Sequence, residues 1–383
     1  MHKILLVSSS RYPTEKAYGV TVGRSAEAAS QMGDKVVIIS PTYSGYDYLG
    51  NEVVTISNLF SKVIKLFYFI TFGSFNILHF YLGRLAVYKK TKKIIFSEKF
   101  DFLWVRDPII AYKAGKKFDL PVLLEIHHIP KKLDLHYCKK ISKLKNITFA
   151  TLTDFHKEEL QKKGIFGEIQ VIPMGYSKDF HAKALSWPKS DGSKIRVCYL
   201  GKSQSNGNDN LIEDMVRSLM VLLRKVSNIE LVLIGLEKDF ISRNLMSDRE
   251  ILCAYQSGRI VITPHVSHLL VPEILKTIDI GVLPYPNTYY NNSRFPIKAL
   301  EYAASATAIV SSRTESHRGI LKEDFASFYD QGDLESLAST ILEVINNPTR
   351  TLEKLISAQE WAEKFTYSSR VISAKNACKI ITE

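Results

Sequence analysis

Residues 278–311 read IDIGVLPYPNTYYNNSRFPIKALEYAASATAIVS. The stretch opens on a short apolar run, 278–283, and closes on a second one, 308–311. Between them, residues 296–305 have the apolar spacing of a helix, and a proline in the first turn is a common way for a helix to begin. A strand, a helix and a strand in this order predict two parallel strands with the helix packed on one face of their sheet.

The same alternation of apolar runs and amphipathic segments continues on both sides of this stretch. Strand candidates are 4–7, 36–39, 102–105, 122–125, 148–151 and 169–172, and, after a break, 196–200, 230–234, 260–262, 278–283 and 308–311. Helical stretches between them include 20–32, 210–224 and 296–305. Two such series in tandem predict an α/β protein with two Rossmann-like domains that face each other across a cleft.

The break between the two series sets the domain limits. Residues 175–191 read GYSKDFHAKALSWPKSD, which we interpret as a polar linker. We therefore predict a first domain over 1–177 and a second over 192–365. We expect residues 366–383 to form a C-terminal helix that returns to the first domain.

The composition is that of an ordinary globular protein. Hydrophobic residues make up 45% and charged residues 23% of the 383 residues, which suits packed cores rather than disorder. The four cysteines form no C-x-x-C pair, which argues against a zinc site or a disulfide scaffold and suits a reducing compartment. Residues 1–10, MHKILLVSSS, lack a cleavage signature, so we interpret them as a first strand rather than a signal peptide. We expect a cytoplasmic protein.

The net charge of +12 lies almost entirely in the first half of the chain. Residues 1–177 contain 26 Lys and Arg against 15 Asp and Glu, whereas the remainder contains 25 against 24. A basic surface of this kind favours an anionic partner, such as a phospholipid surface or an acidic glycan. The lysine clusters lack the aromatic-rich patterns of nucleic-acid recognition, so we expect no nucleic-acid partner.

Residues 66–83 contain no charged side chain and border on the length of a transmembrane helix. They include several polar residues, and a membrane span at this point would cut the first sheet in two. Two readings stay open for the segment. It is either an interfacial segment that places the protein on the inner face of a membrane or a part of the core.

Candidate ligand-binding residues lie where predicted strands end, because ligands of open α/β sheets bind beyond the carboxyl ends of the strands. Gly19 follows the first strand and leads into a helix, where a glycine lets backbone approach a phosphate closely; a simple turn is the alternative. His127 follows the strand 122–125, where it is placed to donate a hydrogen bond to a ligand or to serve the structure. The sequence has no G-x-G-x-x-G fingerprint or Walker loop at this place, which disfavours a dehydrogenase or an NTPase.

The helix predicted over 296–305 carries the most informative charges. Arg294, Lys298 and Glu301 fall near one face of it. The cations suit a diphosphate, and the carboxylate of Glu301 suits the hydroxyls of a ribose. The alternative is a surface pair of Lys298 and Glu301 that contributes little.

These residues resemble the donor-site signature of the retaining glycosyltransferases of family 4, which have the GT-B fold and are also called glycosyl transferases group 1. The helix reads P-x-K-x-x-E-Y-A-A over 296–304, and SATAIV over 305–310 stands where the family has a Gly-x-Pro-Ile-Val strand. Further segments follow in the family's order: IPMGY at 172–176, YLG at 199–201, LIG at 233–235 and IDIGVLP at 278–284. The resemblance therefore covers nearly the whole chain.

The resemblance implies a role for three of the candidate residues. Gly19 resembles part of the family's phosphate-facing glycine loop, and His127 resembles its active-site histidine, near the transferred sugar. Glu301 resembles the second glutamate of its Glu-x₇-Glu motif, on the donor ribose. The family transfers sugar with retention and without a metal or other cofactor. It implies a nucleotide-diphosphate sugar donor in the second domain and a glycan or lipid-linked acceptor in the first, in surface polysaccharide or lipopolysaccharide biosynthesis.

The resemblance also implies how the diphosphate is held. Gly201 lies in the segment that opens the second domain, and Lys202 falls where the family has an arginine for the diphosphate. Lys202 is thus expected to stabilise the departing charge. Asn206 falls where the family has a lysine, so Lys298, with Arg294 in reserve, is expected to supply the missing positive charge.

Two further positions depart from the family pattern, and they motivate alternatives to an active transferase. Ser293 replaces the first glutamate of the motif, and Ala306 stands where the family has a glycine. With Asn206, they motivate a catalytically silent GT-B binding or partner subunit. A nucleotide-sugar epimerase is the other alternative; it needs catalytic carboxylates, for which Glu125 and Asp279 are the strand-linked candidates.

Overall fold

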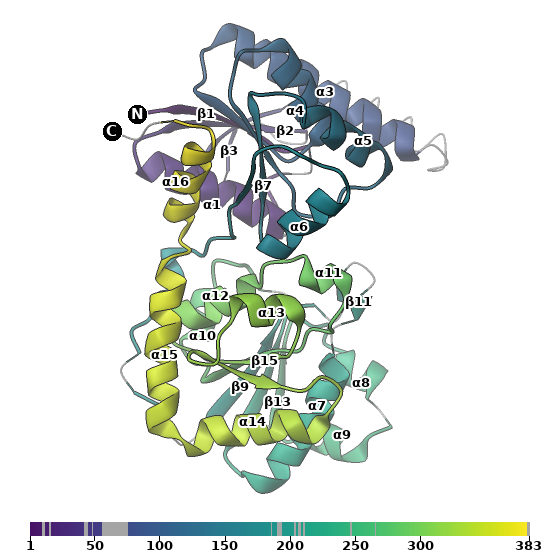
Figure 1. Ribbon diagram of the computed structural model, residues 1–383. Helices are drawn as coiled ribbons and strands as arrows, with labels where there is room; N and C mark the ends of the chain where they lie inside the picture. Colours follow the sequence, from purple (N-terminus) through teal and green to yellow (C-terminus); the bar gives the residue numbers. More distant parts are fainter. Residues whose placement is uncertain are drawn as a thin grey trace. The chain divides into compact units, whose positions relative to one another are not determined.

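The computed structural model describes residues 1–9, 12–14, 17–41, 45–47, 49–55, 76–184, 186–189, 194–202, 204–205, 208–209, 211–245, 247–264 and 266–380. The chain divides into two units (Figure 1). The first comprises Met1–Gly175 with Tyr367–Glu383, and the second comprises Tyr176–Thr366. Each unit contains a parallel sheet with helices on its faces, so the predicted α/β class with two Rossmann-like domains is confirmed.

The described part of the first unit contains an eight-stranded sheet in the order β3-β4-β2-β1-β5-β6-β7-β8. Its strands are β1 (Lys3–Val7), β2 (Lys35–Ser40), β3 (Gly45–Tyr46), β4 (Glu52–Thr55), β5 (Phe102–Val105), β6 (Val122–Glu125), β7 (Ile147–Thr151) and β8 (Ile169–Val171). All neighbours pair in parallel except β3 with β4. Most strands are continuous apolar runs because a parallel sheet is buried on both faces.

Helices cover both faces of this sheet. They are α1 (Ala17–Gln31), α3 (Asn76–Ser97), α4 (Pro108–Lys117), α5 (Lys132–Ile141), α6 (Asp154–Lys162) and α16 (Tyr367–Ala377). Alternate residues of β1 enter different cores: Leu5 packs with residues of α3, α4 and α5, and Ile4 packs with residues of α1 and α16. Figure 1 shows α16, the yellow C-terminal helix, beside α1. The end of the chain thus completes the core of the first unit.

In the described part of the second unit, a six-stranded sheet has the order β13-β12-β9-β14-β15-β16, with all neighbours parallel. Its strands are β9 (Ile195–Leu200), β12 (Ile229–Ile234), β13 (Ile260–Thr263), β14 (Ile280–Leu283), β15 (Ala308–Ser312) and β16 (Ala326–Tyr329). A small hairpin is formed by β10 (Gln204–Ser205) and β11 (Asn208–Asp209).

The helices of the second unit divide between the two faces of its sheet. They are the 3₁₀ helix η1 (Lys178–Phe180) and α7 (Ile212–Lys225), α8 (Phe240–Asn244), α9 (Arg249–Gln256), α10 (Val271–Leu275), α11 (Tyr289–Asn292), α12 (Ile297–Ala304), α13 (Glu315–Ile320), α14 (Leu334–Asn346) and α15 (Pro348–Glu363). Residues of α7, α8, α9 and α14 share one core with Ile280 and Val282 of β14. Gly281 faces the other way: a Cβ there would lie 2.4 Å from the ring of Tyr302, so α12 packs closely on that face.

The segment expected to be a polar linker packs on the second unit where it is described. Phe180 is buried. Lys189 donates from Nζ to the carbonyls of Leu275 and Ser305, at 2.9 and 2.7 Å, and to the hydroxyl of Thr307 at 2.8 Å. Burial lowers the pKa of Lys189 to about 7. The described part of the segment is therefore packed into the second unit and is not a free linker. Its polar composition was misleading, because a buried lysine is tolerated when protein oxygen atoms replace the water around its ammonium group.

No helix in the described part of the chain has both the length and the apolar character needed to cross a bilayer. Residues 66–75 of the uncharged segment lie outside the described residues, and α3 begins directly after them at Asn76.

Candidate active site

A cavity of about 500 Å³ lies in the first unit, at the carboxyl ends of its strands. It is bordered by the end of β1, the start of α1, and the segments that follow β5 and β6. Ser8, Tyr18, Arg106, His127 and Lys131 are among the lining residues. His127, predicted from its place at a strand end, therefore faces a cavity of the size that ligands occupy.

Glu125, the last residue of β6, lines this cavity and contacts several polar and charged side chains around it. It is buried, and Trp104 donates from Nε1 to its Oε2 at 2.7 Å. Arg106 and Arg370 form ion pairs with its Oε1 at 3.1 and 2.5 Å, and His127 contacts the same oxygen through Nε2. Burial works to raise the pKa of Glu125, but Arg106 and Arg370 outweigh it and hold the pKa well below its usual range. Glu125 is therefore an ionised carboxylate committed to protein partners.

The same contacts fix the protonation of His127. Burial, and then the charge of Arg106, lower its pKa to about 3, so the imidazole is neutral near pH 7. An ionised carboxylate only accepts hydrogen bonds, so the proton of His127 lies on Nε2 and is donated to Glu125. The remaining nitrogen, Nδ1, is an acceptor. The sequence interpretation of His127 as a donor to a ligand does not fit this geometry, because its N–H group already donates to the buried Glu125.

Gly19 lies within the first turn of α1 rather than in the loop before it. A Cβ at this position would lie 2.4 Å from both the methyl group and the carbonyl oxygen of Thr14. The local packing of residues 12–14 therefore already requires a glycine here. A phosphate-facing role for Gly19 stays a prediction.

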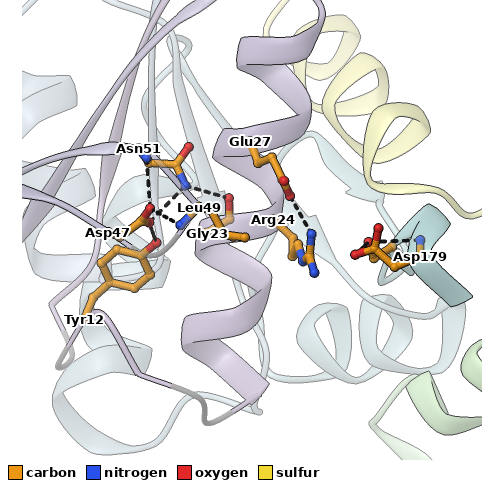
Figure 2. Close-up of polar contacts among 9 residues, drawn as sticks. Tyr12, Gly23, Arg24, Glu27, Asp47, Leu49, Asn51 and Asp179 are labelled. Carbon is orange, nitrogen blue, oxygen red and sulfur yellow. Dashed lines mark hydrogen bonds and ion pairs between the residues drawn. The ribbon is translucent and has the colours of Figure 1, made fainter. Parts of the chain in front are cut away.

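A buried polar network links Tyr12 to Gly23 of α1, as Figure 2 shows. The hydroxyl of Tyr12 donates to Asp47, which also accepts from the side chain of Asn51 at 2.9 Å. Asn51 donates in turn to the carbonyl of Gly23 at 3.1 Å. A Cβ at Gly23 would lie 2.6 Å from the Tyr12 hydroxyl, so this second glycine also admits the segment beside the helix.

In the second unit, Glu301 of α12 is 3% exposed and has a partner at each oxygen. Lys298 donates to Oε2 at 2.7 Å, and Nε2 of His268 contacts Oε1 at 3.1 Å. Burial works to raise the pKa of Glu301, but Lys298 and His268 lower it to about 2. The structure thus brings together two of the predicted residues. It adds His268, which the sequence analysis missed because nothing in the segment before α10 relates it to α12.

Arg294 and Ser293 lie at the end of α11, just before α12. The guanidinium of Arg294 lies 5.0 Å from the centroid of the Tyr290 ring, in a cation–π contact. Ser293 is buried, and its hydroxyl donates to the carbonyl of Tyr290 at 2.8 Å. Where the resemblance leads one to expect a glutamate for sugar hydroxyls, this chain has a hydroxyl bonded to its own backbone.

Gly201 and Lys202 follow β9, at the carboxyl edge of the second sheet. A Cβ at Gly201 would lie 2.6 Å from the hydroxyl of Tyr199, and that hydroxyl donates to the carbonyl of Lys202 at 2.7 Å. The glycine thus lets Tyr199 reach the backbone of Lys202, whose side chain is exposed. Asn206 lies outside the described residues.

The backbone of the turn between α12 and β15 explains one position of the motif, the one that Ala306 occupies. Ala306 has a φ of +53°, in the left-handed region that favours glycine, and it is buried. A family glycine at this position therefore fits a backbone requirement, which this chain meets with an alanine under strain.

Comparisons with known proteins bear on the second unit and on the fold. Residues 194–347 match the family model described as "Glycosyl transferases group 1". No curated protein sequence matches the chain. Among solved structures, a glycosyltransferase from Rickettsia africae ESF-5 superposes with a TM-score of 0.74 at 15% identity, over 99% of this chain and 98% of that one.

Two further structures are similar over the full length. The Anabaena protein Alr3699/HepE, solved in complex with UDP and glucose, has a TM-score of 0.69 at 12% identity and covers 100% of both chains. The lipopolysaccharide outer core galactosyltransferase WaaB, in its apo form, has a TM-score of 0.65 at 17% identity and covers 98% of both. The fold is GT-B. The domain match and the structural neighbours together support a GT-B glycosyltransferase.

Proposed function

We propose that this protein transfers a sugar from a nucleotide-diphosphate sugar to a glycan or lipid-linked acceptor. One observation carries the proposal: the group 1 domain match over 194–347 contains α12, whose Glu301 is held ionised by Lys298 and His268. Glu301 is only 3% exposed, so its pair with Lys298 is not an ordinary surface ion pair. An ionised carboxylate kept at such a place is better explained by ligand binding.

The donor ribose is proposed to bind at Glu301. A carboxylate offers about four lone-pair positions, and Lys298 and His268 each take one, so acceptor capacity remains for two hydroxyl groups. The neighbour from Anabaena was solved with UDP, and we extend that donor class to this chain. The diphosphate is proposed to lie against Gly201, with Lys202 and Lys298 as its cations and Arg294 as the reserve.

The chemical step is proposed to proceed with retention, as in the family that the motif resembles. His127, with Nδ1 as acceptor, would hold a hydroxyl of the transferred sugar, and Lys202 would stabilise the negative charge that develops on the leaving diphosphate. The acceptor hydroxyl would lose its proton to a donor phosphate oxygen. Gly19 would lie near the phosphates, at the start of α1.

The acceptor is proposed to belong to surface polysaccharide or lipopolysaccharide biosynthesis, the latter being the class that the neighbour WaaB serves. A cytoplasmic protein that visits the inner face of a membrane fits this proposal. Phe96, at the end of α3, is 66% exposed, and the ammonium groups of Lys92 and Lys117 lie 5.9 and 5.6 Å from its ring centroid. An exposed aromatic ring between lysines suits an anionic lipid surface.

The silent-subunit alternative keeps one specific observation, the bonding of Ser293 to its own backbone. The epimerase alternative loses both of its candidates. Glu125 is committed to two arginines, and Asp279 accepts the backbone N–H groups of Lys189 and Arg196, each at 2.9 Å.

Titration with UDP and with uridine tests the donor proposal. Lys202→Ala and Lys298→Ala should each weaken UDP binding by about 1.5–3 kcal/mol, the range of hydrogen bonds to charged groups. Lys202→Ala should leave uridine binding nearly unchanged, whereas Lys298→Ala should also weaken it, to a smaller extent, because Lys298 helps to keep Glu301 ionised. The quantity to compare is the ratio of UDP affinity to uridine affinity in the wild type and in each variant. An unchanged ratio would place the phosphates elsewhere and would favour the silent subunit.

A further inference from the structure

The cavity of the first unit is lined by two cations and two carboxylates. Arg106 lines it and has a side chain 19% exposed, and Lys131 lies exposed at its rim. The carboxylates are Glu125 and Asp134. Taken alone, these four residues would cancel, and the cavity would carry no preference for either sign of charge.

Both carboxylates, however, are paired with arginines from outside the lining. Arg370 of α16 contacts Glu125 at 2.5 Å. Arg84 of α3 forms a two-pronged pair with Asp134, at 2.5 and 3.3 Å. Each carboxylate of the lining therefore has an arginine partner outside the lining. Arg106 shares Glu125 with Arg370, so the lining and these partners together carry more positive than negative charge.

A count of the charged network over the described residues gives the same sign. Arg84 also contacts Asp107 at 2.9 Å, so the three carboxylates Asp107, Asp134 and Glu125 face four cations. His127 is neutral and adds nothing. The three arginines balance the three carboxylates, and the exposed Lys131 adds one positive charge in excess.

Arg106 has hydrogen-bond donors for an anion. Its described contacts are Glu125, at 3.1 Å, and the carbonyl of Tyr18, at 3.1 Å, whereas a guanidinium has five N–H groups. Its planar fork matches phosphate and carboxylate oxygens in pairs. The hydroxyl-bearing Ser8 and Ser9 line the same cavity.

We propose that this cavity is an oxyanion-binding site, where Arg106 and Lys131 hold a phosphate or carboxylate group of the acceptor. The assignment to the acceptor rests on the proposed function, but anion binding itself does not. Arg370 has a positioning role. Its positive charge offsets the negative charge of Glu125, which would otherwise be balanced by Arg106 alone.

Calorimetric titration of the full chain at low salt tests the site, with inorganic phosphate and glucuronate as charged probes and glucose as the uncharged one. We expect one phosphate per chain. Lys131→Ala should weaken its binding about tenfold, the equivalent of 1.4 kcal/mol. Lys139→Ala, which makes the same charge change at an exposed position of α5, the helix that Lys131 precedes, should leave binding unchanged. Equal affinities in the wild type and both variants, or no phosphate binding, would overturn the proposal.

Arg370→Gln gives a second test, because Arg370 does not belong to the lining residues. It should weaken phosphate binding about as much as Lys131→Ala. Circular dichroism would verify that the variant is folded, and Lys131→Ala decides if it is not. Phosphate affinity at the wild-type level in a folded Arg370→Gln would contradict the charge argument.

Saturating UDP distinguishes the acceptor from the donor as the source of the anion. We expect phosphate to bind in its presence. Mole-for-mole displacement of phosphate by UDP would assign the cavity to the donor diphosphate and overturn its assignment to the acceptor. A chain that binds phosphate but not UDP would instead contradict the proposed donor and leave the anion site standing. Preference for phosphate over glucuronate, or the reverse, identifies the acceptor group.

Discussion

Glu301 shows how neighbouring side chains keep a buried carboxylate ionised. Its burial alone would favour the neutral acid, and the contacts of Lys298 and His268 reverse that preference. Glu301→Gln keeps the size of the side chain and removes its charge. We expect this variant to bind uridine more weakly by about 1.5–3 kcal/mol, since hydrogen bonds from ribose hydroxyls lose a charged acceptor.

Equilibrium titration with uridine, which has no phosphate, checks the Glu301 prediction. His268→Gln is the companion variant, because a glutamine amide retains a donor to Glu301 and should keep most of the affinity. Uridine affinity that is the same in Glu301→Gln and in the wild type would exclude the ribose role.

His127 allows a test of its tautomer as well as its role. Asparagine places a polar atom near the position of Nδ1, whereas glutamine places one near Nε2, where it can still contact Glu125. If Nδ1 is the functional acceptor, His127→Asn should retain more turnover than His127→Gln, which should fall about tenfold or more. Steady-state kinetics with a UDP-sugar donor, with kcat separated from KM, makes the comparison. The opposite ranking would mean that the contact with Glu125, and not Nδ1, is what turnover needs.

At the scale of elements, the turn between α12 and β15 stores strain. Ala306 is held at a φ of +53°, and this conformation costs an alanine about 1–2 kcal/mol that a glycine does not incur. Ala306→Gly should therefore raise the free energy of unfolding by about 1 kcal/mol or somewhat less, because glycine also adds freedom to the unfolded chain.

Urea denaturation measures the effect, and Ala303→Gly is the matched control. Ala303 lies inside α12 with helical backbone, so the same substitution there should lower stability by about 1 kcal/mol. Opposite signs for the two variants are expected. Loss of stability in both would show that the turn relaxes around Ala306 without strain.

Elements buried on both faces are the ones that the sequence predicts well. The strands β5 and β6 are predicted to the residue, because they are short apolar runs between polar segments. β4 and β16 were missed, since their partly exposed residues interrupt the apolar run. β14 begins at Ile280 instead of 278, because the carboxylate of Asp279 accepts backbone N–H groups of Lys189 and Arg196.

The candidate site is predictable only where its residues share an element. Lys298 and Glu301 lie three positions apart on one helix, so their contact follows from helical spacing. Arg370 reaches Glu125 only because α16 packs on the first unit, and His268 reaches Glu301 only through the fold of the second. Such contacts between distant parts of the sequence set the charges of both sites.

At the scale of the whole molecule, the two units each enclose histidines that are held neutral. Burial, and then Arg106, lower the pKa of His127 to about 3. Burial, and then His128, lower the pKa of His156 to about 4, and burial lowers that of His317 to about 4. In the unfolded chain each of these side chains titrates near pH 6.5.

These shifts predict a loss of stability on mild acidification. Above pH 6.5 both states leave the three imidazoles neutral. Below it the unfolded chain takes up protons that the folded chain refuses, so stability falls as the pH drops toward the folded pKa values. Each histidine should cost about 1.4 kcal/mol between pH 7.5 and 5.5. The carboxylates of Glu125 and Glu301, with lowered pKa values, stay ionised throughout this window.

Denaturant unfolding at the two pH values, in the wild type and in His156→Leu, isolates one of these contributions. The variant removes a titrating group from the first unit, so its own loss between pH 7.5 and 5.5 should be about 1.4 kcal/mol smaller than that of the wild type. Comparing the two pH values within each variant cancels any change in packing, which acts at both. His136→Asn, at an exposed position of α5, should lose as much stability as the wild type. If His156→Leu also loses as much as the wild type, then His156 takes up its proton in the folded chain, and its burial does not keep it neutral.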